Sequence, residues 1–105
     1  MRRAVAGLLA LALAAPSGAA QEGRVQRGRV FVETHCAGCH AVGLTGESPL
    51  AEAPPFRTLE QRYPVEDLAE ALAEGITTGH PSMPEFVLDP AQINDVIAYL
   101  KSIQR

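Results

Sequence analysis

The cysteine-containing segment constrains this chain more than any other feature. Both cysteines lie in the run Cys36-Ala37-Gly38-Cys39-His40. Cys-x-x-Cys-His is the attachment pattern for c-type haem. Two thiols add to the vinyl groups at one edge of the porphyrin, and the histidine folds beneath the ring to meet the iron. The motif therefore predicts one haem c, attached through thioethers at Cys36 and Cys39, with His40 as an iron ligand.

Other uses of a Cys-x-x-Cys pair fit the sequence less well. A thioredoxin-like redox pair belongs to an α/β fold, and the chain has no alternating or β-branched runs to build a sheet. A zinc site needs four ligands, and only His35 or His80 could complete the set. A short-range disulfide is possible in an exported protein, but it leaves His40 unexplained. Haem attachment accounts for all three residues.

The first twenty residues have the layout of a secretory signal peptide. Arg2 and Arg3 form a basic start, an apolar run covers residues 5–15, and small residues stand at positions 19 and 20. An uncleaved anchor is the alternative, although a spanning helix needs about 20 apolar residues. We predict that residues 1–20 are a signal peptide, cleaved before Gln21 or one residue earlier. Residues 21–105 are then the mature domain, located in the periplasm.

The mature chain is small and acidic. Removing residues 1–20 lowers Lys plus Arg from 9 to 7 against 12 Asp plus Glu, so the net charge changes from -3 to -5. A nucleic-acid partner would call for a basic face, and none is predicted. A single domain of about 85 residues buries a modest core and usually needs a crosslink or ligand for stability. The haem is the expected stabilising group.

Two helices are predicted on either side of a long loop. The first covers residues 23–34, with Val25, Gly28 and Phe31 or Val32 on one face. The second begins after Pro64, with Glu66 and Asp67 in its first turn, where the helix dipole favours acids. Its apolar stripe is formed by Val65, Leu68, Leu72 and Ile76. Gly75 is expected to end the helix.

The third predicted helix has the clearest start. Asp89 can cap it, Pro90 fits its first position, and Gln92 completes a near capping box. Apolar residues then recur at helical spacing: Ile93, Val96, Ile97, Leu100 and Ile103. The connections over residues 41–61 and 79–89 are long and rich in Gly and Pro. Loops of this length usually indicate function or a bound group against which they pack.

Met83 is the candidate for the sixth iron ligand. It is the only methionine after residue 20, and it lies between Pro81 and Pro84 in a stiff loop. A rigid loop can hold a weak thioether on iron without a large ordering cost. His80, three residues away, is the alternative; two histidines would lower the reduction potential, whereas His-Met coordination raises it. His35, next to Cys36, is expected at the surface or near a propionate.

Taken together, these residues resemble the class I cytochromes c. The resemblance covers nearly the whole mature chain and rests on Gly28, the Cys36–His40 motif, Met83-Pro84 and the segment Val96–Lys101. It implies an all-α class I cytochrome c fold, in which three main helices and long loops wrap around one covalently attached haem. It also favours Met83 over His80 as the ligand opposite His40.

The resemblance implies particular contacts as well. Gly28 should let the last helix cross the first closely, with Tyr99 at the contact. A proline carbonyl in the loop after the motif should orient the other ring nitrogen of His40. Pro54 is the better candidate and Pro49 the alternative, and Phe56 is expected to pack on the haem. The family often has an aromatic residue four positions before the first cysteine, whereas this chain has Val32 there.

The function that this resemblance implies is one-electron transfer without enzymatic catalysis. The expected partners are redox proteins, a dehydrogenase or reductase as donor and an oxidase or reductase as acceptor. The protein is expected to be a monomer and at most peripheral to a membrane. Lys101 is the only lysine, so docking through a ring of lysines is not expected. The alternatives are a haem subunit dedicated to one enzyme complex, and a ligand-binding or catalytic haem protein with a labile Met83.

Overall fold

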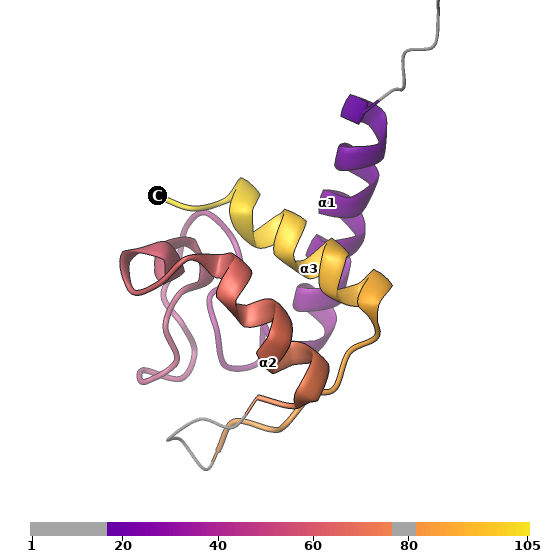
Figure 1. The fold of residues 1–105 in the computed structure, drawn as a ribbon. Coiled ribbons are helices and arrows are strands. Elements are labelled where there is room, and N and C mark those ends of the chain that lie inside the picture. The colour runs from indigo at the N-terminus through magenta and orange to yellow at the C-terminus, as the bar shows by residue number, and fades with distance from the viewer. Residues whose placement is uncertain (1–16, 77–81) are drawn as a thin grey trace, which may run out of the picture.

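The computed structural model describes residues 17–76 and 82–105. Within these ranges it contains helices and loops and no strands. Its elements are α1 (Ser17–His35), α2 (Leu68–Glu74) and α3 (Pro90–Ser102), with two short 3₁₀ helices, η1 (Phe56–Gln61) and η2 (Val65–Asp67). Figure 1 shows α3 crossing α1, with α2 and the loops beside this pair. The predicted all-α fold of three main helices and long loops is confirmed.

The crossing of α1 and α3 depends on Gly28. A Cβ atom at this position would collide with the main-chain carbonyl of Asp95 and lie 2.8 Å from Tyr99 Cβ. The predicted contact between Gly28 and Tyr99 is therefore present, and the carbonyl of Asp95 approaches even more closely. Arg27 reinforces the crossing from α1, because its Nε donates to Asp95 Oδ2 at 3.1 Å.

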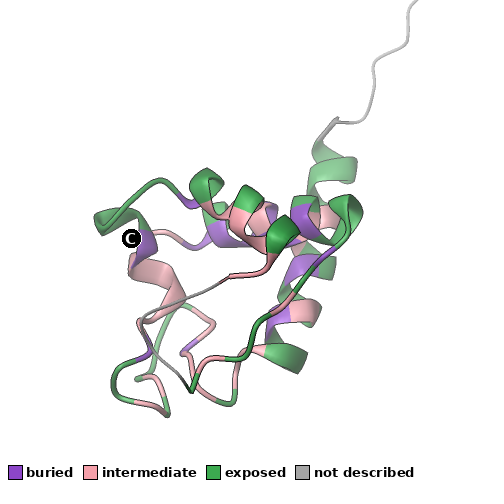
Figure 2. Cartoon of the chain, turned by 60° about the horizontal axis from the view of Figure 1, so that its bottom comes forward, coloured by how far each residue is buried: buried purple, intermediate pink, exposed green. Residues whose placement is uncertain are grey.

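The core lies mainly between these two helices and the 3₁₀ segments. It is formed by buried apolar side chains from α1, η1, η2, α3 and the segment before α3: Val32, Leu59, Val65, Leu88, Ile93, Val96, Tyr99, Leu100 and Ile103. Figure 2 shows the buried positions of α1 and α3 on facing sides. Val25 and Phe31 are half-buried against this core, as the predicted face of the first helix requires.

The second predicted helix is present in two pieces. Its first turn is the 3₁₀ helix η2, where Val65 is fully buried, and the α-helical part ends at Glu74. Gly75 ends the helix with a φ of 104°, a conformation that favours glycine. The backbone then continues through Ile76, which lies beyond the helix and not on its stripe as predicted.

The start of α3 follows the prediction closely. The Asp89 side chain accepts from Gln92 N at 2.9 Å, and the Gln92 side chain accepts from Asp89 N at 3.0 Å. Pro90 occupies the first helical position. This reciprocal capping box satisfies two backbone donors that would otherwise lack partners at the helix start. None of the described helices combines the length and the apolarity needed to cross a membrane.

Candidate functional site

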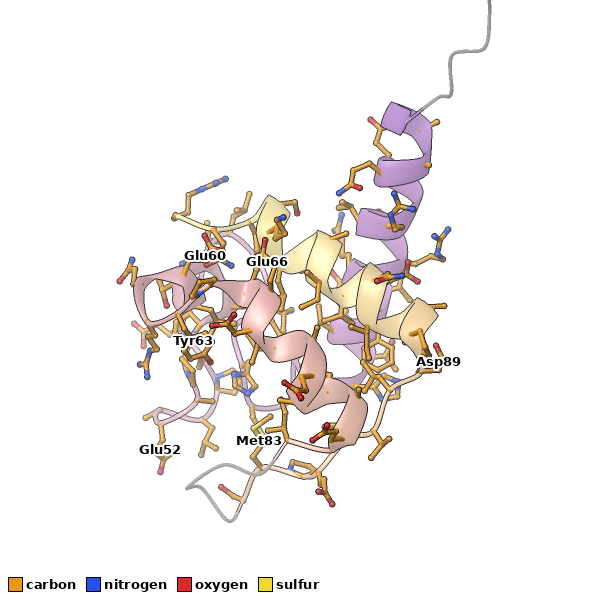
Figure 3. All side chains as sticks on the ribbon, viewed as in Figure 1. Glu52, Glu60, Tyr63, Glu66, Met83 and Asp89 are labelled. Atoms are coloured by element: carbon orange, nitrogen blue, oxygen red, sulfur yellow. The ribbon has the colours of Figure 1, made fainter. Side chains whose placement is uncertain are left out.

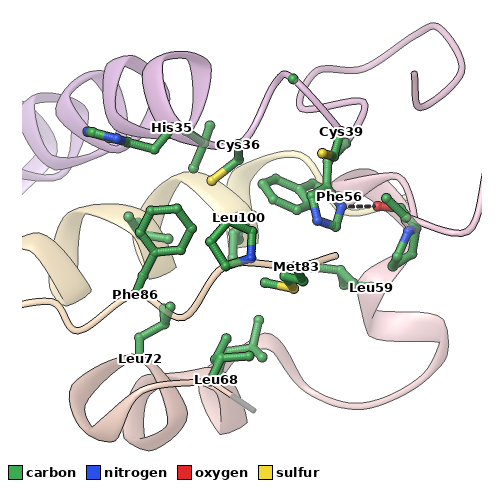
Figure 4. A pocket seen from close by; sticks show the side chains of 18 of the residues that line it. His35, Cys36, Cys39, Phe56, Leu59, Leu68, Leu72, Met83, Phe86 and Leu100 are labelled. Atoms are coloured by element: carbon green, nitrogen blue, oxygen red, sulfur yellow. Dashed lines mark hydrogen bonds between the residues drawn. The ribbon is translucent and has the colours of Figure 1, made fainter. Parts of the chain in front are cut away.

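One cavity brings together every residue that the sequence predicted for the cofactor site. Its volume is about 540 Å³, within the range of small-molecule and cofactor pockets. The six predicted site residues that line it are Cys36, Cys39, His40, Pro54, Phe56 and Met83. Figure 4 shows the two cysteines on one side of the cavity and Met83 across from them. The remaining wall is mostly apolar, with Leu59, Leu68 and Leu100 among its residues.

The motif occupies a helical turn that continues from α1. Cys36 N donates to Val32 O at 2.8 Å, and His40 N donates to Cys36 O at 3.0 Å. This turn directs Cys36, Cys39 and His40 toward the same cavity. Gly38 has no other atom within 4 Å of the place where a Cβ would stand, so the backbone is open there. The spacing thus gives the two-thiol and one-imidazole arrangement that haem attachment requires.

The two thiols are free and half-buried. Burial, and then the neighbouring Cys39, raises the pKa of the Cys36 thiol to about 11. Redox-active Cys-x-x-Cys pairs depend on a lowered pKa, because the thiolate is the nucleophile. The environment of Cys36 therefore disfavours a thioredoxin-like function. Among the described residues, no three His, Cys, Asp or Glu side chains form a group that could hold a metal ion.

His40 is fixed by residues 41–61, which we call the proximal loop. His40 Nδ1 lies 2.8 Å from the Pro54 carbonyl oxygen. Because a carbonyl can only accept, Nδ1 carries the proton of this bond, and Nε2 is the nitrogen left to bind a metal. The Phe56 ring lies beside the imidazole, with ring centroids 4.6 Å apart. Pro54, and not the alternative Pro49, makes the contact that the resemblance implies.

The proximal loop is itself held by main-chain hydrogen bonds on both sides of His40. Leu50 N donates to Cys39 O at 3.0 Å, and Phe56 N donates to Ala41 O at 2.9 Å. The Tyr99 hydroxyl adds a bond from α3, since it donates to Val42 O at 2.6 Å. The irregular loop therefore holds Pro54 and Phe56 against His40.

Met83 reaches the cavity from the opposite side. It is half-buried and belongs to residues 82–89, which we call the Met83 strap. Leu88 N at the end of the strap donates to Leu72 O of α2 at 2.8 Å. The Glu85 side chain packs against Gly75, where a Cβ would lie 2.5 Å from Glu85 Oε2. The competing ligand His80 and its neighbour Pro81 lie outside the described residues.

His35 and two polar residues complete the account of the site. His35 is exposed, as predicted, and its ring packs between Phe31 and Phe86, at centroid distances of 4.5 and 6.2 Å. Glu52 and Tyr63 also line the cavity. They lie on the same side of the molecule, and Met83 lies close to α2 (Figure 3). The cavity wall therefore includes polar as well as apolar side chains.

These residues fit a c-type haem. The apolar walls match the faces of a porphyrin, and the two thiols stand on the turn that presents His40. Sequence reasoning missed Leu59, a buried residue of the cavity wall, because the 3₁₀ helix that carries it was predicted as loop.

Comparison with known proteins agrees with this geometry. The family model described as Cytochrome c matches residues 25–104. A protein of Bradyrhizobium diazoefficiens named cytochrome c-552 is 30% identical over 96 residues, which cover 91% of this chain and 90% of that protein. A Synechocystis protein named cytochrome c-553-like is 29% identical over 84 residues, covering 80% of this chain and 73% of that protein. No solved structure matches the chain at comparable significance.

Proposed function

Because the chain belongs to the cytochrome c family, we propose that it is a one-electron carrier whose haem iron is held between His40 and Met83. Family membership gives haem c as the cofactor and haem-based electron transfer as the function. When bound, the haem supplies the couple between ferrous and ferric iron. The observation that carries the proposal is the single cavity shared by Cys36, Cys39, His40 and Met83.

His40 provides the proximal ligand in this proposal. Its Nδ1 proton is donated to the Pro54 carbonyl at 2.8 Å, which orients the ring and raises the basicity of Nε2. Phe56, with its ring beside the imidazole, restricts rotation about the side-chain bonds of His40. The chain thus fixes both the tautomer and the direction of the ligating nitrogen.

Met83 provides the distal ligand. A thioether raises the reduction potential compared with a second imidazole, which suits a carrier that must accept electrons readily. Leu88 N on Leu72 O holds the end of the strap to α2, so Met83 stays on the cavity side. With both axial positions filled by the chain, no position remains for a substrate. This supports a carrier and not an enzyme.

The apolar wall would keep water from the iron. Leu59 and Leu100 are almost fully buried, and both line the cavity. A hydrophobic shell of this kind lowers the local dielectric and controls the reduction potential.

We also propose that residues 1–20 are removed on export to the periplasm. The described part of this segment supports the proposal, because residues 18–20 are exposed and Gly18 contacts nothing within 4 Å of its Cβ position. The side chains of α1 that pack on the core begin only at Val25. Cleavage before Gln21 would therefore shorten α1 without loss of core contacts.

The proposed partners are exported or membrane-bound redox proteins, with the carrier acting as a monomer between a donor and an acceptor. Between Arg62 and Lys101 the chain has seven acidic residues and no Lys or Arg. This segment of the chain includes α2 and the Met83 strap. A partner that approaches the Met83 side would therefore need a neutral or basic surface, because like charges across an interface are unfavourable.

Spectroscopy of the mature protein tests the axial ligands. The wild type is expected to show low-spin haem in both oxidation states and the sulfur-to-iron charge-transfer band of a thioether ligand when oxidised. Met83→Ala should remove this band, lower the reduction potential and allow carbon monoxide to bind the ferrous protein. Val87→Ala is the matched control, because Val87 is in the same strap and is 69% exposed.

The same measurements distinguish the alternatives. If Met83→Ala has the wild-type spectrum and His80→Ala does not, His80 is the ligand and the proposal is wrong. Rapid carbon monoxide binding by the wild-type ferrous protein would instead indicate a labile Met83 and a ligand-binding function. Co-purification with one large enzyme in fixed stoichiometry would indicate a dedicated subunit.

A further inference from the structure

The side chain of Gln104, just after α3, makes an unusual set of contacts with the proximal loop. Its Nε2 donates to Phe56 O at 2.8 Å, and its Oε1 accepts from Glu60 N at 2.8 Å. The same Nε2 donates to Leu100 O at 2.7 Å. One carboxamide thus connects Leu100, in the last turn of α3, with Phe56 and Glu60, which lie four residues apart in η1.

The positions of these partners give the contacts a structural meaning. In an α-helix the N–H of Glu60 would donate to the carbonyl of Phe56, four residues earlier. Here the Gln104 carboxamide stands between the two groups and bonds to each. It replaces the helical hydrogen bond with a bridge through a side chain, and the segment is held as the 3₁₀ helix η1 (Phe56–Gln61).

The main chain at the C-terminus adds to the same attachment. Arg105 N donates to Arg57 O at 2.8 Å, and Gln61 Nε2 donates to Arg105 O at 3.2 Å. Gln104 is therefore bonded to η1 through its side chain, and Arg105 is bonded to η1 through its main chain. The Gln104 side chain reaches the carbonyl of Phe56 at the start of η1. The Gln61 side chain, at the other end of η1, bonds to Arg105 O.

Phe56 connects this attachment to His40. Its N–H donates to Ala41 O, the residue after His40, at 2.9 Å, and its carbonyl accepts from Gln104. Its ring lies 4.6 Å from the imidazole, and Pro54, two residues earlier, accepts from His40 Nδ1 at 2.8 Å. Movement of the Phe56 peptide would therefore move both groups that orient His40.

We propose that Gln104 is a positioning residue for the proximal imidazole, acting through Phe56 and Pro54. The inference rests on the proposed function only in that His40 is the iron ligand. Without the carboxamide, Glu60 N and Phe56 O can bond directly, and the start of η1 widens from a 3₁₀ turn toward an α-turn. The Pro54 carbonyl then withdraws from His40 Nδ1, and the hydrogen bond between them weakens.

A weaker bond at Nδ1 has a definite electronic consequence. An imidazole that donates a hydrogen bond from Nδ1 is the more basic ligand. A basic ligand stabilises the more positively charged ferric iron. Loss of Gln104 is therefore expected to shift the reduction potential upward and to expose the Nδ1 proton of His40 to exchange with solvent.

Gln104→Met in the holoprotein tests this, since methionine keeps the length and approximate volume of glutamine and removes its three hydrogen bonds. Gln61→Met is the matched control, because it loses a bond to the same C-terminal residues and leaves Phe56 untouched. We expect a higher midpoint potential and about tenfold faster exchange of the His40 Nδ1 proton in Gln104→Met only. Gln104→Asn, whose shorter side chain cannot span all three partners, should show the same changes to a smaller extent.

The outcomes separate this inference from the proposed function. An unchanged potential and unchanged proton exchange in both Gln104 variants, with the spectrum of the wild type intact, would overturn the role of Gln104 alone. Equal changes in Gln61→Met would also overturn it, since a general loosening of the C-terminus would then suffice. A wild-type protein whose His40 resonances show no coupling to the iron would contradict the proposed function itself.

Discussion

The proximal loop and the Met83 strap both lack long helices, yet they are fixed in different ways. The proximal loop is held by hydrogen bonds that reach it from three places: Cys39 in the motif, Tyr99 on α3 and Gln104 after α3. In the strap, the hydrogen bond from Leu88 N to Leu72 O is joined by sterically restricted backbone and by packing. Gly75 stands at a φ of 104° against Glu85, and Pro84 follows Met83 directly.

This difference has a chemical reason. The proximal ligand is an imidazole, whose second nitrogen can be oriented by a hydrogen bond, so a polar network controls it. A thioether has no proton to donate and its sulfur is only a weak acceptor, so backbone conformation and packing do most to keep it on iron. The proximal side should therefore respond mainly to loss of hydrogen bonds and aromatic contacts, and the distal side to changes in backbone conformation.

The largest expected effect comes from removing one aromatic residue on each side. Phe56→Ala and Phe86→Ala each remove a half-buried ring that packs on the core, and each should lower the free energy of unfolding by about 2 to 3 kcal/mol. Their spectra should differ. Phe56→Ala should change the resonances of His40, and Phe86→Ala should weaken the sulfur-to-iron band. Denaturant unfolding and spectra of both holoproteins provide the measurement.

The comparison would fail if both variants changed the same ligand. It would also fail if the proximal variant altered the Met83 band more than the distal variant did. Val30→Ala serves as the control, because Val30 lies on the outer face of α1, is 52% exposed and lies outside the cavity wall.

A smaller effect is expected at two glycines that make a matched pair, Gly75 after α2, which contacts the strap, and Gly46 in the proximal loop. Gly46 has a φ of 93° and Gly75 a φ of 104°, so alanine strains the backbone at both, by about 1 to 2 kcal/mol. A Cβ at Gly46 would contact nothing within 4 Å, whereas at Gly75 it would meet the Glu85 side chain. Only Gly75→Ala should displace the strap.

The measurement that separates strain from displacement is a titration to alkaline pH. It gives the pH at which the sulfur-to-iron band of the ferric protein disappears. We expect this pH to fall in Gly75→Ala and to stay at the wild-type value in Gly46→Ala, although both variants unfold at lower denaturant concentration. Equal behaviour of the two variants would show that contact between Gly75 and Glu85 does not hold Met83 in place.

The two regions also differ in how much of each could be predicted from the sequence. The haem-attachment motif and the capping box at Asp89 follow from local chemistry, whereas the helix crossing at Gly28 was expected from the family resemblance; the structure has all three. The contact of Pro54 with His40 came from the family resemblance, because nothing in the residues themselves marks one proline among several. Local rules also missed that the second helix begins as the 3₁₀ helix η2.

The hydrogen bonds of the Gln104 side chain and of the Tyr99 hydroxyl could not be predicted from the sequence. Gln104 bonds to residues 44 and 48 positions earlier, and the Tyr99 hydroxyl to a carbonyl 57 positions earlier. Such pairs arise only when the two helices have crossed and brought the chain end back to the loop. A glutamine near a chain end has no local signal that separates it from a solvated side chain.

The smallest expected effect concerns an ion pair that joins η2 to α3. Lys101 Nζ lies 2.7 Å from Glu66 Oε2, and both side chains are about half exposed. The hydrogen bond from Lys101, more than any other interaction, lowers the pKa of Glu66 below its usual value of 4.5. Because the folded pKa is the lower one, any stabilisation is complete above pH 4.5 and is lost as the pH falls through the folded pKa.

Glu66→Gln tests this pair, with Glu70→Gln on the exposed side of α2 as the control. The variant should match the wild type at acid pH, where Glu66 is already protonated, and should be slightly less stable near neutral pH. Added salt should remove the difference, because solvent ions screen exposed charges. Both axial ligands should be unaffected at every pH. A change in the sulfur-to-iron band would mean that η2 and α2 transmit charge effects to the strap. Charge would then act on Met83 in addition to backbone conformation, packing and the bond of Leu88 N to Leu72 O.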